Sequence, residues 1–299
     1  MLRADVDTIA VGVLDTGTSG DLLSPPDQRM LRFADGARAG LDGTWRYHIS
    51  APLDRVGRGP LQPWSGGLAA HFNGMIAPMG AYNLRRVAWY QGESNVDDAA
   101  GYARLLRALM ADWRARIGAP TLPFLIVQLP NFGAPATAPQ SSAWAELRET
   151  QRRVAANDPH AALIVSIDLG DRFDIHPTNK QEIGRHLALA ARSAIYGENF
   201  AAFGPAPTRA ARRSGGVEIV FAHAADGLDA LGAADPLGFE LCDNEHRCRY
   251  VEAKIQQNSV RLTTGASGRF IRYCWADSPL CNLANSAQLP GVPFELPLP

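Results

Sequence analysis

The residues with the clearest capacity for chemistry lie in the segment 171–177, Asp-Arg-Phe-Asp-Ile-His-Pro. This segment follows an apolar run, residues 163–167, which has the composition of a buried strand. His176 is the best candidate for a general base, and Asp174 or Asp171 could orient its second ring nitrogen and stabilise the imidazolium. The alternative interpretation is a helix-capping loop in which His176 is simply solvated.

A second candidate is the loop Gln91-Gly92-Glu93-Ser94-Asn95. The backbone N–H of Gly92, together with a side chain of Gln91 or Asn95, could form an oxyanion hole. The alternative is a glycine-containing loop in which Glu93 has a structural role. Ser94 lies beside these donors rather than opposite them, and Ser65 precedes the first apolar strand, so neither serine has the context expected of a nucleophile.

The elements that must position these residues alternate between strand and helix. Apolar strands are predicted at 87–90, 124–129 and 161–167, and amphipathic helices follow them, the first capped by Asp97 or Asp98 and stopped by Gly118. Such alternation predicts an α/β fold with a parallel sheet covered by helices on both faces. Ligands of such sheets bind at the carboxyl ends of the strands, and polar residues follow all three strands here.

The flanking regions are predicted to be β-rich. Strand candidates at 9–13, 29–33 and 44–49 precede a Pro- and Gly-rich connection at 52–78. After a linker predicted at Pro205-Ala206-Pro207, further short strands indicate a β-sandwich. Their ranges are 217–221, 239–242, 250–255, 260–263 and 270–275. The Pro-rich end, 289–299, is expected to lie along a surface.

Composition excludes several classes of function. The 299 residues carry a net charge of -1, which gives no electrostatic reason to expect nucleic acid as a partner. No apolar run is long enough for insertion into a membrane, and the first residues lack the apolar core of a signal peptide. No phosphate-binding loop and no cluster of metal ligands is present, so we expect neither a cofactor nor a metal.

All four cysteines, Cys242, Cys248, Cys274 and Cys281, lie in the last sixty residues. Their even number suggests disulfides, of which three pairings exist, although free thiols are an alternative. A metal site in the segment 242–248 is the less favoured interpretation, because its spacing matches no zinc knuckle and its acidic residues are typical of a polar loop.

Several blocks of the sequence resemble the sialate O-acetylesterase family of SGNH-type carbohydrate esterases. The blocks are Trp89-Tyr90-Gln91-Gly92-Glu93-Ser94-Asn95, Asn73-Gly74-Met75-Ile76-Ala77-Pro78 and Asp174-Ile175-His176-Pro177 with Asn179-Lys180-Gln181; similarity extends to 124–131 and 272–277.

The resemblance implies a serine esterase that removes acetyl groups from sialic acid or related sugars without a metal or cofactor. It assigns the general base to His176, and it implies oxyanion or substrate binding by Gln91, Gly92, Glu93 and Asn95. Family members carry an Asp three residues before the histidine. Phe173 occupies that position here, and Asp174 is the nearest substitute.

The resemblance also implies a domain order: the end of an inserted β domain at 1–50, the C-terminal part of an SGNH-type domain, flavodoxin-like and incomplete, at 51–200, and a β-sandwich at 201–299. The family's nucleophile stands in a Gly-Gln-Ser-Asn block that is absent from this sequence. We therefore expect a chain that begins inside the inserted domain and is inactive alone.

Two alternatives come from other classes. One is a carbohydrate-binding or structural β protein with a vestigial esterase site; the other, weaker because no ligand cluster exists, is a metal-dependent hydrolase. Relatives are usually exported or periplasmic, whereas this sequence shows no export signal.

Overall fold

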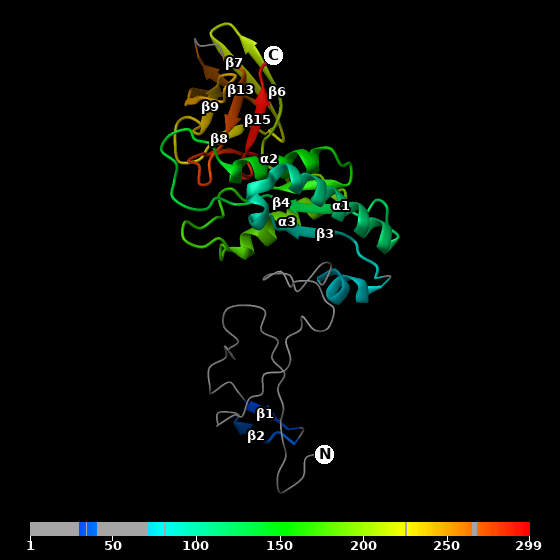
Figure 1. Cartoon of the computed structure of the whole chain (residues 1–299). Helices are drawn as coiled ribbons and strands as arrows, with labels where there is room; N and C mark the ends of the chain where they lie inside the picture. Colours follow the sequence, from blue (N-terminus) through cyan, green and yellow to red (C-terminus); the bar gives the residue numbers. More distant parts are fainter. Residues whose placement is uncertain (1–29, 34, 41–70, 81, 225, 265–267) are drawn as a thin grey trace. The chain divides into compact units, whose positions relative to one another are not determined.

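The computed structural model describes residues 30–33, 35–40, 71–80, 82–224, 226–264 and 268–299 (Figure 1). The chain divides into two units, Met1–Gly80 and Ala81–Pro299, and we describe each by itself. The strands expected at 9–13 and 44–49, and Ser65, lie outside the described residues.

The first unit contains a short antiparallel hairpin of β1 (Met30–Arg32) and β2 (Arg38–Gly40). The turn between them is stabilised by the Asp35 carboxylate, which accepts the N–H of Ala37 at 2.9 Å, and Gly36 has a φ of 86°. These strands confirm the one expected near 29–33. The described end of the predicted connection is helical instead, with a π-helix at Phe72–Ile76 and a 3-10 helix at Ala77–Met79.

The second unit begins with a three-stranded parallel sheet in the order β3 (Val87–Tyr90), β4 (Phe124–Val127) and β5 (Ala161–Ile164). Val87, Phe124 and Ala161 are aligned across the three strands. The sheet therefore confirms the predicted α/β class. β3 has the predicted bounds, whereas β4 and β5 are shorter than the apolar runs that predicted them.

Three helices cover this sheet: α1 (Ala99–Ile117), α2 (Ala143–Ala156) and α3 (Lys180–Ala194) (Figure 1). Successive side chains of a strand point to opposite faces. Phe124 and Ile126 of β4 accordingly join the core with α1 and α2, whereas Leu125 and Val127 join the core with α3. This two-sided burial is the reason that β4 is apolar along its whole length.

The helix boundaries follow from their capping residues. Asp98 accepts the N–H of Gly101 at 2.8 Å at the start of α1, and Gly118 ends that helix with a left-handed φ of 68°. Ser142 and Asn179 cap α2 and α3 in the same way as Asp98. None of the described helices is long and apolar enough to cross a membrane.

The rest of the unit is antiparallel β structure. One sheet has the order β10-β9-β13-β15, a second has the order β11-β12-β7-β6, and β8 pairs with β14. The apolar faces of the two four-stranded sheets share one core that contains Ile219, Phe239, Ile271 and Phe294. The strand bounds are β6 Ala206–Arg213, β7 Gly216–Ala222, β8 Leu228–Ala230, β9 Phe239–Cys242, β10 Cys248–Tyr250, β11 Glu252–Gln256, β12 Ser259–Thr263, β13 Phe270–Tyr273, β14 Leu283–Asn285 and β15 Phe294–Pro297.

Two expectations for this region were wrong, and proline caused both errors. Two residues of the linker predicted at 205–207, Ala206 and Pro207, begin β6, an edge strand whose register shifts between Pro207 and Arg209. The Pro-rich end does not lie along a surface, because β15 pairs with β13 and Phe294 is fully buried. Proline is tolerated at strand ends and on edge strands, so its presence did not exclude these strands.

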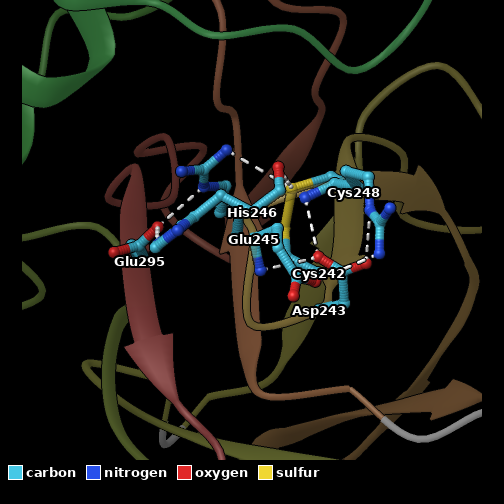
Figure 2. The surroundings of a disulfide bond; sticks show 8 residues. Cys242, Asp243, Glu245, His246, Cys248 and Glu295 are labelled. Atoms are coloured by element: carbon cyan, nitrogen blue, oxygen red, sulfur yellow. Dashed lines mark hydrogen bonds and ion pairs between the residues drawn. A yellow bond between two sulfur atoms is a disulfide. The ribbon is translucent and has the colours of Figure 1, made fainter.

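The four cysteines form two local disulfides, Cys242–Cys248 and Cys274–Cys281. Figure 2 shows the first, which joins the ends of β9 and β10 beneath a polar loop. Asp243 organises that loop by accepting the N–H groups of Glu245 and Arg247. The carboxylate of Glu240 lies within 4.8 Å of both sulfurs, but the sulfurs are bonded to each other. The structure thus has the loop-closing disulfide that the sequence favoured.

Candidate active site

The three parallel strands end at one edge of the sheet, and the segments that follow them are held together by hydrogen bonds. Gln151 of α2 is the central residue of this network. Its side chain donates a hydrogen bond to the carbonyl of Gln91 at 3.1 Å and accepts one from the N–H of Leu129 at 2.9 Å. The Tyr102 hydroxyl donates to the same Gln91 carbonyl at 2.8 Å. Gln151 therefore joins the exit of β3 to the exit of β4 from inside the core.

The exits of β4 and β5 are joined directly. Asn131 Oδ1 accepts the N–H of Gly170 at 2.8 Å, and Phe132 forms an isolated parallel bridge with Asp171. A Cβ atom at position 170 would lie 1.8 Å from the carbonyl oxygen of Asn131, so this close approach requires glycine. The predicted general-base loop is thus anchored at its first residue.

Two aspartates shape the loop that carries His176. The Asp171 carboxylate accepts the N–H groups of Phe173 and Asp174, at 2.7 and 3.2 Å, and Asp174 accepts the N–H of His176 at 2.7 Å. These are successive Asx turns, in which a short carboxylate replaces a backbone acceptor. Ile175, within the same loop, is partly buried and packs against the core that contains residues of α1 and α2.

The imidazole of His176 is 80% exposed, and its Nδ1 lies 3.9 Å from Asp174 Oδ1. Both aspartates proposed as its orienter accept backbone N–H groups, and Asp174 is the one that also lies next to the ring. This separation of 3.9 Å is longer than a hydrogen bond. Phe173 is 85% exposed, so the position of the family's aspartate faces solvent here.

The loop after β3 forms the other side of the candidate site. Glu93 accepts the N–H of Gly92 at 2.9 Å, and the Gln91 amide donates to Asn95 Oδ1 at 2.9 Å. The Gly92 amide that was predicted as an oxyanion donor is thus occupied by a carboxylate in this structure. Ser94 is exposed on the 3-10 turn that follows, Glu93–Asp98.

A hollow of about 280 Å³ lies next to this loop. Its lining includes the side chains of Gln91 and Asn95 together with Trp89, Tyr102 and Leu106. The hollow combines an apolar wall with amide groups, which is the usual composition of a small-ligand site.

Tyr90, directly before the 91–95 loop, and Lys180, shortly after the 171–177 loop, are in contact. The ammonium of Lys180, four residues after His176, lies 4.8 Å from the centre of the Tyr90 ring. Burial, together with the charge of Glu93, raises the pKa of Tyr90 to about 12, so its hydroxyl remains protonated. Within the described residues, that buried hydroxyl has no hydrogen-bond partner, and no hydrogen bond or ion pair joins His176 to 91–95.

Sequence reasoning did not assign roles to Gln151, Asn131, Tyr90 or Lys180. Gln151 gave a signal, because a polar residue on the apolar face of a helix must find a buried partner. Tyr90 and Lys180 lie inside the two resembling blocks, but nothing in their spacing predicts that they meet. That contact depends on the position of α3 on the second face of the sheet.

The chain is similar to known carbohydrate esterases in sequence and in structure. Residues 56–193 match a family model described as carbohydrate esterase, sialic acid-specific acetylesterase. The human sialate O-acetylesterase is 30% identical over 260 residues, which cover 75% of this chain and 48% of that protein, and the mouse sialate O-acetylesterase is 27% identical over 256 residues.

Among solved structures, a carbohydrate acetylesterase from Xanthomonas citri superposes with a TM-score of 0.70 at 37% sequence identity. That similarity covers 75% of this chain and 53% of the other. The chain spans about half the length of the curated relatives it matches. Residues 56–193 of this chain are therefore similar to the sialic acid-specific acetylesterase family of carbohydrate esterases.

Proposed function

We propose that this chain carries the acid–base half of an SGNH-type carbohydrate O-acetylesterase site, which hydrolyses acetyl esters on sialic acid or related sugars. The observation that carries the proposal is the 171–176 loop, where a strand exit presents His176 beside the carboxylate of Asp174. The match to acetylesterases supports the reaction class.

In this mechanism, His176 removes the proton from a serine hydroxyl as the oxygen attacks the acetyl carbonyl. Asp174 stabilises the resulting imidazolium, which returns the proton to the departing sugar oxygen. Water then attacks the acetyl-enzyme, and acetate leaves. Donors of the 91–95 loop hold the negative charge of the carbonyl oxygen, which requires the Glu93 carboxylate to leave the Gly92 N–H.

The proposal also concerns the location of the nucleophilic serine. The 299 residues contain no Gly-Gln-Ser-Asn block. Ser94 lies in the same turn as the proposed oxyanion donors, where it cannot oppose them across a substrate. We therefore assign the serine to a polypeptide segment that bears this block, and we expect this chain alone to give no turnover.

The test compares acetate release from O-acetylated sialic acid and from p-nitrophenyl acetate. The chain alone should be inactive, and co-expression with a segment that bears the Gly-Gln-Ser-Asn block should produce activity. In the active assembly, His176→Ala should reduce kcat by about 10²–10⁴-fold. His160→Ala, at the opposite end of the sheet, is the matched control and should retain activity.

Two results would contradict the proposal. Turnover by the isolated chain that disappears in Ser94→Ala would place the nucleophile within these residues. Full activity of the assembly with His176→Ala, in a protein of unchanged circular dichroism, would remove His176 from the mechanism.

A further inference from the structure

A second hollow, far larger than the one beside Gln91, lies between the segment after β4 and the C-terminal β structure. Its volume is about 590 Å³, within the usual range of about 300–1,000 Å³ for ligand sites. We call it the Tyr250 groove, and its lining includes Thr137, Asp235, Leu237, Tyr250, Lys254 and Leu280.

Three large apolar side chains are exposed in this groove. Leu237 is 51% exposed, Tyr250 is 41% exposed and Leu280 is 56% exposed. Single exposed apolar residues are ordinary, but a group of them in one concave surface indicates a binding site. These three come from three different segments of the chain, so the fold has brought them together.

The polar groups of the groove are small in number and mixed in charge. Lys254 and Asp235 form an ion pair at 2.5 Å, and Glu252 lies beside them in the lining. Burial, together with the charge of Glu240, raises the pKa of Tyr250, so its hydroxyl can donate a hydrogen bond at neutral pH. One ammonium among two carboxylates disfavours an anionic ligand and suits a neutral ligand with many hydroxyl groups.

The walls of the groove are fixed by covalent and hydrogen bonds. Asn282 accepts the N–H of Leu237 at 2.8 Å and donates to the carbonyl of Leu231. The disulfide of Cys281 holds the segment of Leu280, and a Cβ at Gly238 would lie 2.8 Å from Cys281 Cβ. A groove fixed in this way loses little conformational entropy when it binds a ligand.

The groove is also connected to the candidate active site. The segment after β4 contributes Asn131 to the strand-exit edge and Ala136 to the groove, and it is anchored where Phe132 and Ala136 donate to the carbonyls of Asp277 and Ser278. Asn131 and Ala136 are five positions apart in the sequence, so their Cα atoms are separated by at most about 18 Å. A glycan of a few sugar units is long enough to reach both places.

We propose that the Tyr250 groove binds a neutral oligosaccharide segment of the substrate. The apolar face of a sugar ring packs on Tyr250 and Leu280, and its hydroxyls bond to Asp235, Glu252 and Lys254. This inference rests on the proposed function for the identity of the ligand, and it extends the substrate from a single acetylated sugar to an acetylated glycan chain.

The test is native affinity electrophoresis of the full 299-residue chain in gels that contain arabinoxylan, galactomannan or hydroxyethyl cellulose. At least one of these neutral, unacetylated polymers should retard the chain. Tyr250→Ala should weaken the retardation at least fivefold, and Leu280→Ser is a second variant that is independent of the tyrosine. Tyr196→Ala, which also replaces an exposed tyrosine, should behave as the parent chain.

Polysialic acid is the anionic comparison and should cause no retardation. The assay measures binding and needs no turnover. The oligosaccharide proposal can therefore be refuted while the esterase proposal stands, and the esterase proposal can be refuted while the oligosaccharide proposal stands. Equal mobility with and without every neutral polymer would overturn the inference, as would retardation that neither groove variant changes. Self-association that Tyr250→Ala abolishes would assign the groove to a second copy of the chain instead.

Discussion

At the scale of single residues, the loop after β3 depends on a glycine that is packed against the core. Gly92 has a φ of 157°, and a Cβ at this position would lie 2.7 Å from Leu147 Cδ2 and 3.2 Å from Gln151 Nε2. Leu147 is fully buried, so it cannot move away without disturbing α2. The added Cβ would also crowd the side chain of Gln151, which joins the exits of β3 and β4.

We therefore predict that Gly92→Ala destabilises the protein by about 1–3 kcal/mol, since an added methyl group overpacks the core. Gly184→Ala is the matched control, because Gly184 lies inside α3 and a Cβ added there would meet no atom within 4 Å. That change should stabilise the protein by about 1 kcal/mol, the difference in helix propensity. Urea denaturation of both variants measures the two effects; a neutral Gly92→Ala would refute the packing argument.

Residue types predicted the candidate site only in part. A histidine and two aspartates directly after a buried strand singled out the 171–177 loop, and the Asx turns of Asp171 and Asp174 are local geometry that such residues favour. The partners of the Gln91 carbonyl, Tyr102 and Gln151, are not local in this sense. Their meeting depends on how α1 and α2 pack on the sheet, and no spacing in the sequence contains that information.

At the scale of elements, helices were easier to predict than strands. Asp98, Ser142 and Asn179 cap their helices with side-chain oxygens, and such residues mark helix starts in the sequence. The missed strands, β2, β6, β8, β14 and β15, are short or contain proline. β8, β14 and β15 pair with strands that are distant in sequence, which a local pattern does not reveal.

One sheet carries an acidic side chain in an unfavourable place. Glu240 lies in the middle of β9, opposite Tyr250 of β10 and Arg272 of β13, and is only 1% exposed. Its Oε2 has no hydrogen-bond partner within the described residues. Burial raises the pKa of Glu240 from 4.5 to about 7, and the positive charge of Arg272, which is ion-paired with Glu295, opposes the rise only partly.

This raised pKa gives stability a definite dependence on pH. Between about pH 4.5 and 7 the folded state keeps a proton that the unfolded state has lost, so Glu240 makes the free energy of unfolding fall as the pH rises through that window. Glu240→Gln should remove this contribution, on the order of 2 kcal/mol between pH 5 and pH 8. Urea denaturation of both proteins at the two pH values, with the disulfides intact, measures it. If the free energy of unfolding changed equally between the two pH values in parent and variant, Glu240 would ionise in the folded state as it does in the unfolded chain.

At the scale of the whole second unit, the α/β part and the C-terminal β part are joined by buried polar contacts. Asp277 accepts a hydrogen bond from the Ser142 hydroxyl at 2.6 Å, and Ser142 also caps α2. Arg148, fully buried on the same helix, donates to the carbonyls of Ala276 and Asp277. The 272–277 block that resembles the family is therefore the joint between the two parts.

This joint leads to a prediction about cooperativity. Burial lowers the pKa of Arg148 to about 9, against the attraction of Asp277, so its guanidinium is still charged at neutral pH and holds both carbonyls. Arg148→Ala leaves those acceptors without a donor and opens a cavity, and we expect a loss of about 2–4 kcal/mol. Arg153→Ala, on the same helix but 57% exposed and paired with Glu149, should change stability by less than about 0.5 kcal/mol.

In scanning calorimetry the parent unit should unfold in one transition, whereas Arg148→Ala should lower the midpoint temperature or separate the unfolding into two transitions. Because Arg148 is the only one of the pair that contacts Asp277, an equal effect of the two substitutions would mean that helix propensity, and not the joint, sets the stability of the unit.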